Sequence, residues 1–143
     1  MTRPRTQARE VALQVLYQLD IRDDQSAAEL LAEVSEEVSG HDAQELAKTL
    51  VEGTRANLAA IDAEVEGVAH NWEMKRMAAI DRNILRLGTY ELLFRPDLPA
   101  PVSINEAVQL AKKFSTKESG GFVNGILDKV HQRHLDPAAE GGS

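Results

Sequence analysis

Apolar residues recur at intervals of three and four along nearly the whole chain of 143 residues. This spacing places them on one face of an α-helix, whereas a half-buried β-strand would alternate apolar and polar residues. No convincing alternating segment occurs, so we predict an all-α fold. The apolar stripes consist of Ala8, Ala12, Val15, Leu16 and Leu19; of Leu30, Val34 and Val38; of Leu46, Leu50, Leu58, Ile61, Val65 and Val68; of Ile80, Ile84 and Leu87; of Ile104, Ala107, Val108, Ala111 and Phe114; and of Phe122, Val123, Ile126, Leu127 and Val130.

Several helix starts are marked by a short polar residue that is followed three positions later by Glu. In this capping box the two side chains satisfy free backbone N–H groups of the first turn. We predict capping boxes at Ser26 with Glu29, at Asp42 with Glu45 and at Ser103 with Glu106. Gly40 should end the second helix. Gly53 interrupts the third stripe without breaking its period, so we predict one long helix from Asp42 to about Val68.

Proline and glycine divide the second part of the chain. Residues 70–72 mark a junction, and we place the boundary between two helical halves there, with a possible short helical turn after it. The next helix must finish near Arg95, because the prolines at 96, 99 and 101 cannot continue it. We predict a loop over residues 115–121, in which Gly120 and Gly121 relieve strain. Residues 136–143 should be disordered, since they hold nothing large to bury.

The size and composition of the chain restrict its class. A length of 143 residues suits one compact domain. The chain has no cysteine, which excludes disulfides, thiolate nucleophiles and cysteine zinc sites. The basic start is not followed by an apolar signal core, and no segment approaches the roughly 20 apolar residues that cross a bilayer. We therefore expect a soluble, cytoplasmic protein.

The net charge of −7 would ordinarily argue against a nucleic-acid partner. However, the charge is unevenly distributed: residues 1–22 have a net charge of +2, residues 23–66 of −10 and residues 67–143 of +1. RNA responds to charges within about one Debye length, roughly 8 Å in physiological salt. A local basic patch can therefore bind RNA on an acidic protein.

Catalytic and metal sites have only weak support. His131 and His134 stand three apart beside Asp128 and Asp136, a spacing that can bind a metal, but we interpret them as the polar end of the last helix. Gly120 and Gly125 are spaced as in a phosphate loop, yet the Lys-Ser/Thr pair that should follow is missing. Paired carboxylates such as those at 36 and 37 belong to a solvated acidic face. We predict no catalytic residue, no metal and no cofactor.

Glu91 lies on an apolar stripe with Ile84 and Leu87. A lone buried charge would cost several kcal/mol, so Glu91 needs partners. We considered Asn105, Asn124 or a helix N-terminus. The favoured interpretation is a structural carboxylate that ties helices together.

Two basic groups are candidates for RNA binding. Arg3, Arg5 and Arg9 fall within seven residues without an intervening acid, and their guanidinium groups could bind successive phosphates. The alternative is that this basic start is simply solvated. The second group comprises Lys112, Lys113 and Lys117 and borders Phe114 and Phe122. Unpaired bases stack on aromatic rings while ammonium groups meet phosphates, although both rings could equally belong to the core.

Several segments together resemble the NusB family. Residues 102–115 (VSINEAVQLAKKFS) and 122–128 (FVNGILD) resemble its C-terminal signature. Residues 81–86 (DRNILR) and 90–92 (YEL) are similar to the helix before that signature, and residues 8–17 (AREVALQVLY) to the opening helix. The resemblance extends from about Arg5 to Val130 in this order.

This resemblance implies an all-α fold of about seven helices in two packed helical-bundle halves, about 1–70 and 71–135, within one domain over 1–135. It implies a role in processive antitermination of ribosomal RNA transcription by RNA polymerase. In that role NusB pairs with NusE, a small-subunit ribosomal protein, and the pair binds boxA RNA. By the family pattern, RNA would contact Arg5, Arg9, Lys117, Glu118 and Phe122, and NusE would contact Tyr17 and Asp81. Glu118 stands where aspartate is common in the family.

Two alternatives remain open. A NusB-like domain also resembles the N-terminal part of some ribosomal RNA cytosine methyltransferases. Against this, the sequence ends after the helical region, with no room for a cofactor-binding sheet, and it lacks the cysteine that such an enzyme needs. The other alternative is a helical protein-interaction module without RNA, which would suit the acidic segment 23–66.

Overall fold

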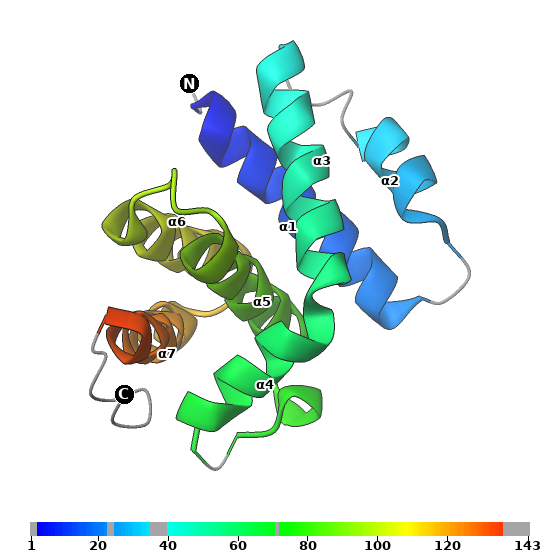
Figure 1. Cartoon of the computed structure of the whole chain (residues 1–143). Helices are drawn as coiled ribbons and strands as arrows, with labels where there is room; N and C mark the ends of the chain where they lie inside the picture. Colours follow the sequence, from blue (N-terminus) through cyan, green and yellow to red (C-terminus); the bar gives the residue numbers. More distant parts are fainter. Residues whose placement is uncertain (1–2, 23–24, 35–39, 71, 136–143) are drawn as a thin grey trace.

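The computed structural model describes residues 3–22, 25–34, 40–70 and 72–135, and this part of the chain is helical without a strand (Figure 1). The all-α prediction is therefore confirmed. The elements are α1 (Pro4–Ile21), α2 (Ala27–Val34), α3 (His41–Ala56), α4 (Leu58–Val68), the short 3-10 turn η2 (Met74–Arg76), α5 (Ala79–Phe94), α6 (Ala100–Phe114) and α7 (Lys117–Leu135). None of the described helices is long and apolar enough to cross a membrane.

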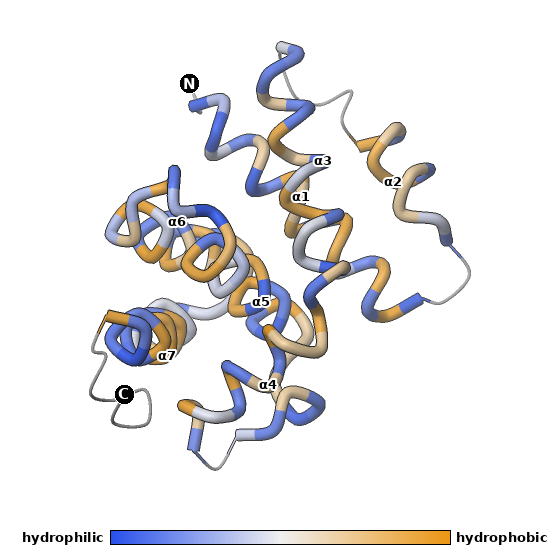
Figure 2. The backbone as a smooth tube through the Cα atoms, viewed as in Figure 1, coloured by the Kyte–Doolittle hydropathy of each residue, from blue (hydrophilic) through white to orange (hydrophobic). Residues whose placement is uncertain are grey.

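Helix α5 lies at the centre of the molecule and packs against α1, α3, α4, α6 and α7 (Figure 1). Its central position explains why most of its residues from Asn83 to Glu91 are buried. The apolar faces of the helices turn toward one another, as the orange stretches in Figure 2 show. Fully buried leucine and isoleucine side chains such as Ile84, Leu85 and Leu127 each contribute about 1.5–3 kcal/mol.

Two glycines allow helices to approach α5 closely. A Cβ atom at Gly53 of α3 would lie 2.2 Å from the ring of Tyr90. On α5 itself, a Cβ at Gly88 would lie 2.7 Å from Leu127 of α7. Both distances are below any normal van der Waals contact, so these positions need glycine for close packing.

The prediction of one long third helix was wrong, because the chain breaks at Asn57 between α3 and α4 (Figure 1). The side-chain amide of Asn57 donates to the carbonyl oxygen of Gly53 at 2.8 Å, and its backbone N–H donates to the same oxygen at 3.2 Å. Asparagine side chains compete in this way with the regular helical hydrogen bonds. The apolar period continues past Asn57, but α4 takes a new direction and packs against α5 and α7.

Of the three predicted capping boxes, only that at Ser26 has a contact among the described hydrogen bonds, and this is the half made by the serine side chain. The backbone N–H of Glu29 donates to Ser26 Oγ at 3.3 Å. Helix α3 instead follows Gly40 at a positive φ of 95°, without a side-chain cap, and α6 begins at Ala100, so Ser103 lies inside the helix. Proline is tolerated in the first turn of a helix, which is why Pro101 does not prevent this earlier start.

The predicted loop at 115–121 is also largely helical, because α7 begins at Lys117. Thr116 precedes it, and Thr116 Oγ1 accepts the backbone N–H of Ser119 at 3.2 Å. Gly120 does not relieve strain in a turn; it lies in the helix, where a Cβ would be 3.3 Å from Lys112 Cγ. The short turn expected after residues 70–72 is η2. Two further predictions cannot be compared with the structure. The expected end of the second helix falls between Val34 and Gly40, where residues 35–39, including Val38, lie outside the described residues, and so does the tail from 136 onward.

Candidate nucleic-acid interface

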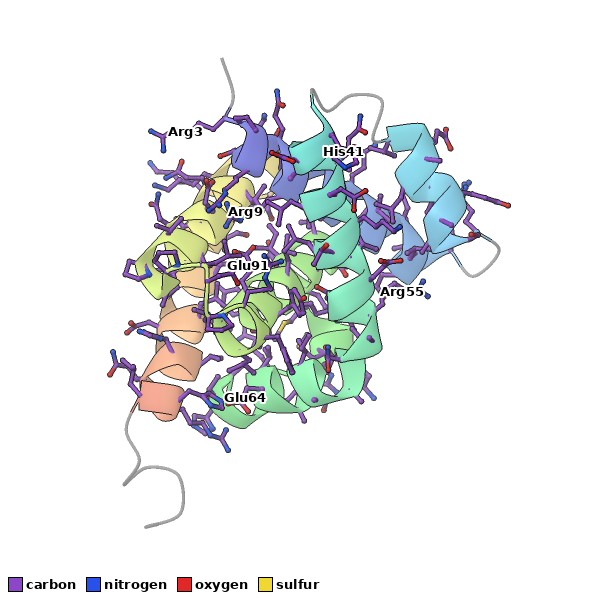
Figure 3. The ribbon with its side chains drawn as sticks, turned by 45° about the horizontal axis from the view of Figure 1, so that its top comes forward. Arg3, Arg9, His41, Arg55, Glu64 and Glu91 are labelled. Atoms are coloured by element: carbon purple, nitrogen blue, oxygen red, sulfur yellow. The ribbon has the colours of Figure 1, made fainter. Side chains whose placement is uncertain are left out.

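Arg9 of α1 and Glu91 of α5 form a buried ion pair where the two helices meet (Figure 3). Arg9 is only 1% exposed, and its Nε and Nη2 donate to the carboxylate at 2.9 and 2.8 Å. Ser103 Oγ donates to the same carboxylate at 2.7 Å, and Glu106 Oε1 lies 3.5 Å from Arg9 Nη1. Burial alone would lower the pKa of Arg9, but hydrogen bonding and charge from Glu91 outweigh it and raise this pKa.

This geometry corrects one expectation and confirms another. Arg9 does not present its guanidinium group to phosphates, because the group is enclosed between helices. Glu91 is the structural carboxylate that its position predicted, but its partners are Arg9 and Ser103, while Asn105 and Asn124 are exposed. The sequence did hold a signal for Arg9, which lies four residues before Leu13 and seven before Leu16 on the buried face of α1.

The other predicted cations remain at the surface. Arg3 and Arg5 lie at the start of α1, and both are exposed (Figure 3 labels Arg3). Lys112 and Lys113 lie in the last turn of α6, and Lys117 opens α7. Lys113 reaches across to α1, where its Nζ lies 2.7 Å from the carboxylate of Glu10, so this cation is partly neutralised.

A polar groove of about 470 Å³ runs between α1 and α6. Its walls are joined by a hydrogen bond from Thr6 to Glu106 at 2.7 Å, and by the Lys113–Glu10 pair. The groove thus combines two cations, Arg3 and Lys113, with the carboxylates of Glu10 and Glu106 and with side-chain amides. It is lined by Arg3, Thr6, Glu10, Asn105, Glu106, Gln109, Leu110 and Lys113. No sequence pattern indicates that Asn105 and Gln109 share this groove, because only helix packing brings α1 beside α6.

A second hollow, of about 290 Å³, lies where η2, α5 and the start of α7 meet. Trp72 and Phe122 contact each other edge to face, with ring centroids 5.5 Å apart. Trp72 is 50% exposed and Phe122 is half-buried, so both rings are partly accessible. Phe114 is 44% exposed, and Lys113 Nζ lies 5.3 Å from the centroid of its ring. This exposure argues against the alternative that Phe114 belongs to the core.

Asp81 lines this same hollow together with Glu118 and Phe122. Its Oδ2 accepts a hydrogen bond from Ser119 Oγ at 2.9 Å, which fixes the carboxylate against the start of α7. The structure thus brings together residues that the family resemblance assigned to two different partners. Tyr17, the other residue assigned to NusE, is half-buried on α1 and does not line the hollow.

One of the two histidines near the end of α7, His134, makes a structural contact. His134 Nε2 lies 2.8 Å from Glu64 Oε1 and so connects α7 to α4. Arg133 Nε lies 3.7 Å from the same oxygen. No group of three or more His, Cys, Asp or Glu residues within the described ranges is arranged to hold a metal ion.

Comparison with known proteins identifies the family to which this architecture belongs. The sequence model of the NusB family matches residues 6–132. The chain belongs to the NusB family. Within it, the transcription antitermination protein NusB of Pelotomaculum thermopropionicum is 48% identical over 128 residues, or 88% of each chain. The protein of the same name from Anaeromyxobacter dehalogenans is 46% identical over 147 residues, covering 99% of each chain.

Solved NusB structures share the fold. NusB of T. maritima matches 98% of this chain and 99% of its own with a TM-score of 0.87 at 37% identity. A structure of the antitermination factors NusB and NusE in complex with dsRNA matches 92% of this chain and 98% of that chain, with a TM-score of 0.83 at 35% identity. The NusB-like segments 102–115 and 122–128 fall largely on α6 and on α7, which border the groove and the aromatic hollow.

Proposed function

We propose that this NusB-family chain is a transcription antitermination factor that binds boxA-type RNA together with a NusE-type ribosomal protein and promotes processive ribosomal RNA transcription. The observation that carries this proposal is that exposed cations gather at the start of α1 and at the α6–α7 junction, the latter beside accessible aromatic rings, with the polar α1–α6 groove between α1 and α6. Membership of the family supports it, as does the match to a NusB that was solved with NusE and dsRNA.

In this proposal the RNA strand follows the surface cations. Phosphates are bound by Arg3 and Arg5 at one end and by the lysines of the α6–α7 junction at the other, at Lys112, Lys113 and Lys117. A base stacks on Phe122, whose ring is held edge to face by Trp72. Glu118 is exposed beside this ring and limits nonspecific attraction of phosphates, which favours selectivity over raw affinity.

The NusE-type partner is proposed to contact Asp81 and Tyr17. Because Asp81 shares its hollow with Glu118 and Phe122, a protein bound at Asp81 lies directly beside RNA bound at Phe122. Each partner should then raise the affinity of the chain for the other by the same factor, as thermodynamic linkage requires. We propose binding rather than catalysis as the whole activity, within the cytoplasmic antitermination complex of RNA polymerase.

The deciding experiment measures the anisotropy of labelled boxA RNA titrated with the protein, with and without the cognate NusE. We expect boxA to bind more tightly than a shuffled RNA of equal composition, and more tightly still with NusE. Lys117→Gln should weaken binding, whereas Lys129→Gln, an equal charge change at an exposed position farther along α7, should not. Equal affinity for boxA and shuffled RNA in the presence of NusE would contradict the proposal and favour a protein-interaction module.

A further inference from the structure

A third depression lies beyond the start of α1, against the first turns of α3 and the turn that joins α5 to α6. It has a volume of about 620 Å³ and combines three arginine side chains with an apolar floor. Its lining includes Arg3, Arg5, Asp42, Leu46, Arg95 and Leu98. Neither basic group recognised in the sequence includes Arg95, which stands alone between α5 and a proline.

The position of Arg95 is fixed by the turn that it begins. Its backbone N–H donates to the carbonyl of Glu91, and its own carbonyl accepts the N–H of Leu98 at 3.0 Å. The guanidinium group donates to both carboxylate oxygens of Asp97, from Nε at 2.9 Å and from Nη2 at 2.8 Å. The side chain of Arg95 is 22% exposed and that of Asp97 is 58% exposed. Because Nε and Nη2 already donate to Asp97 and Nη1 is buried, an anion binds Arg95 by displacing this exposed carboxylate.

Asp97 neutralises only part of the positive charge here. Hydrogen bonding from Arg95 lowers the pKa of the Asp97 carboxyl, and the charge of Arg5 lowers it further. The depression as a whole therefore has three guanidinium groups, at Arg3, Arg5 and Arg95, against the carboxylates of Asp42 and Asp97. Guanidinium groups suit phosphate because they can donate two parallel hydrogen bonds to its oxygens.

Arg3 lines both this depression and the α1–α6 groove, so the two are continuous at that residue. A strand that follows this polar groove toward the start of α1 reaches Arg3 and then the depression. Leu46, which is half-buried, offers apolar surface to a sugar or to the face of a base, whereas Leu98 beneath it is buried. The continuity with the groove favours a polynucleotide as the occupant over a separate protein segment.

We propose that this depression is an additional RNA-binding subsite, in which Arg95 together with Arg3 and Arg5 binds phosphates of a strand that extends past the groove. The inference rests on the proposed RNA-binding function and adds to it a contact that requires a longer RNA. The footprint of RNA on this protein then reaches the α5–α6 turn.

Two substitutions at one ion pair provide the test. Arg95→Gln removes the cation, and Asp97→Asn removes the carboxylate that competes with phosphate. If the pair serves only to hold the turn, both changes weaken the turn and act in the same direction on RNA affinity. If Arg95 contacts RNA, Arg95→Gln weakens RNA binding whereas Asp97→Asn does not.

Affinities should be measured by anisotropy over a range of salt concentrations, with a boxA core oligonucleotide and with the same core extended by several nucleotides at either end. For one extended RNA we expect Arg95→Gln to weaken low-salt binding up to about fivefold. The salt slope should also fall by roughly 0.7, the value for one lost single-strand phosphate contact. Asp97→Asn should leave that affinity equal or increase it, and neither change should affect the core RNA.

The inference is overturned if Arg95→Gln has the same effect on core and extended RNAs, or none on either, or if Asp97→Asn weakens binding in parallel with it. Those results leave the proposed function intact, provided that the unaltered protein binds boxA RNA. If the unaltered protein binds no RNA with or without NusE, the proposed function fails and this subsite with it. Thermal melting of both variants identifies any loss of affinity that is caused by unfolding.

Discussion

Replacing Arg9 with Met tests whether this arginine is structural, as its burial indicates, or a phosphate ligand, as its place in a basic N-terminal segment predicted. The substitution removes three hydrogen bonds from Nε and Nη2 to Glu91. The carboxylate would then stay buried, with Ser103 as its remaining hydrogen-bond donor among the described residues. Breaking one side of a buried ion pair in this way typically costs about 3–5 kcal/mol.

Such a loss is large beside the total stability of a domain, which is about 5–15 kcal/mol. Urea denaturation followed by circular dichroism should show it directly, and the melting temperature should fall by roughly 10–15 °C. Combining Arg9→Met with Glu91→Leu removes the stranded charge and should recover much of the stability, since apolar replacements of buried pairs are often neutral.

RNA affinity of the folded Arg9→Met protein, measured below its unfolding transition, completes the test. We expect it to remain close to that of the unaltered chain, because the guanidinium group does not reach the surface. Unchanged stability combined with weakened RNA binding and a reduced salt slope would refute the structural assignment. The same substitution at exposed Arg5 provides the contrast, with stability retained and the salt slope reduced by roughly 0.7.

Further changes test the site, the packing and the electrostatics. Glu118→Gln should tighten RNA binding at low salt, and this gain should shrink as the salt concentration rises. If an anisotropy series shows that the variant binds RNA more weakly at low salt, the Glu118 carboxylate accepts a hydrogen bond from RNA. Gly53→Ala should destabilise the fold by about 1–3 kcal/mol in thermal melts, because the new methyl group overlaps the ring of Tyr90, whereas Gly125→Ala, with open space around it, should be neutral or stabilising. The pKa of Asp20 is lowered in the fold, because hydrogen bonds and charges from Arg82, Asn83 and Arg86 outweigh its desolvation. The ionised Asp20 carboxylate therefore stabilises the fold above the ordinary aspartate pKa of about 4, and this contribution is lost as the pH falls through the lower pKa of Asp20 in the folded protein. An Asp20→Asn variant that loses as much stability between pH 5 and 2 as the unaltered protein would contradict this.

The sequence by itself determined most of the helical segments and the apolar face of each helix, although not the helical start of α7 or the burial of Arg9. Period and polarity are local properties, so stripes such as Ile80–Ile84–Leu87 predicted α5, and Glu91 on that stripe implied a buried carboxylate with a partner. The exposed cations at Arg3, Arg5 and Lys117 were also visible, because charged residues outside an apolar stripe remain in water. The motifs of α6 and α7 were sufficient to indicate the family.

Tertiary structure decided which partners these residues meet. An apolar stripe shows which face of a helix is buried, but not which helix it packs against. Nothing local could therefore join Arg9 to Glu91 across 82 positions of sequence. Likewise, the break at Asn57 depends on one side chain competing for the carbonyl of Gly53, although the apolar period continues unchanged. The groove and the Arg95 depression arise between helices that are distant in sequence, so only packing assembled them.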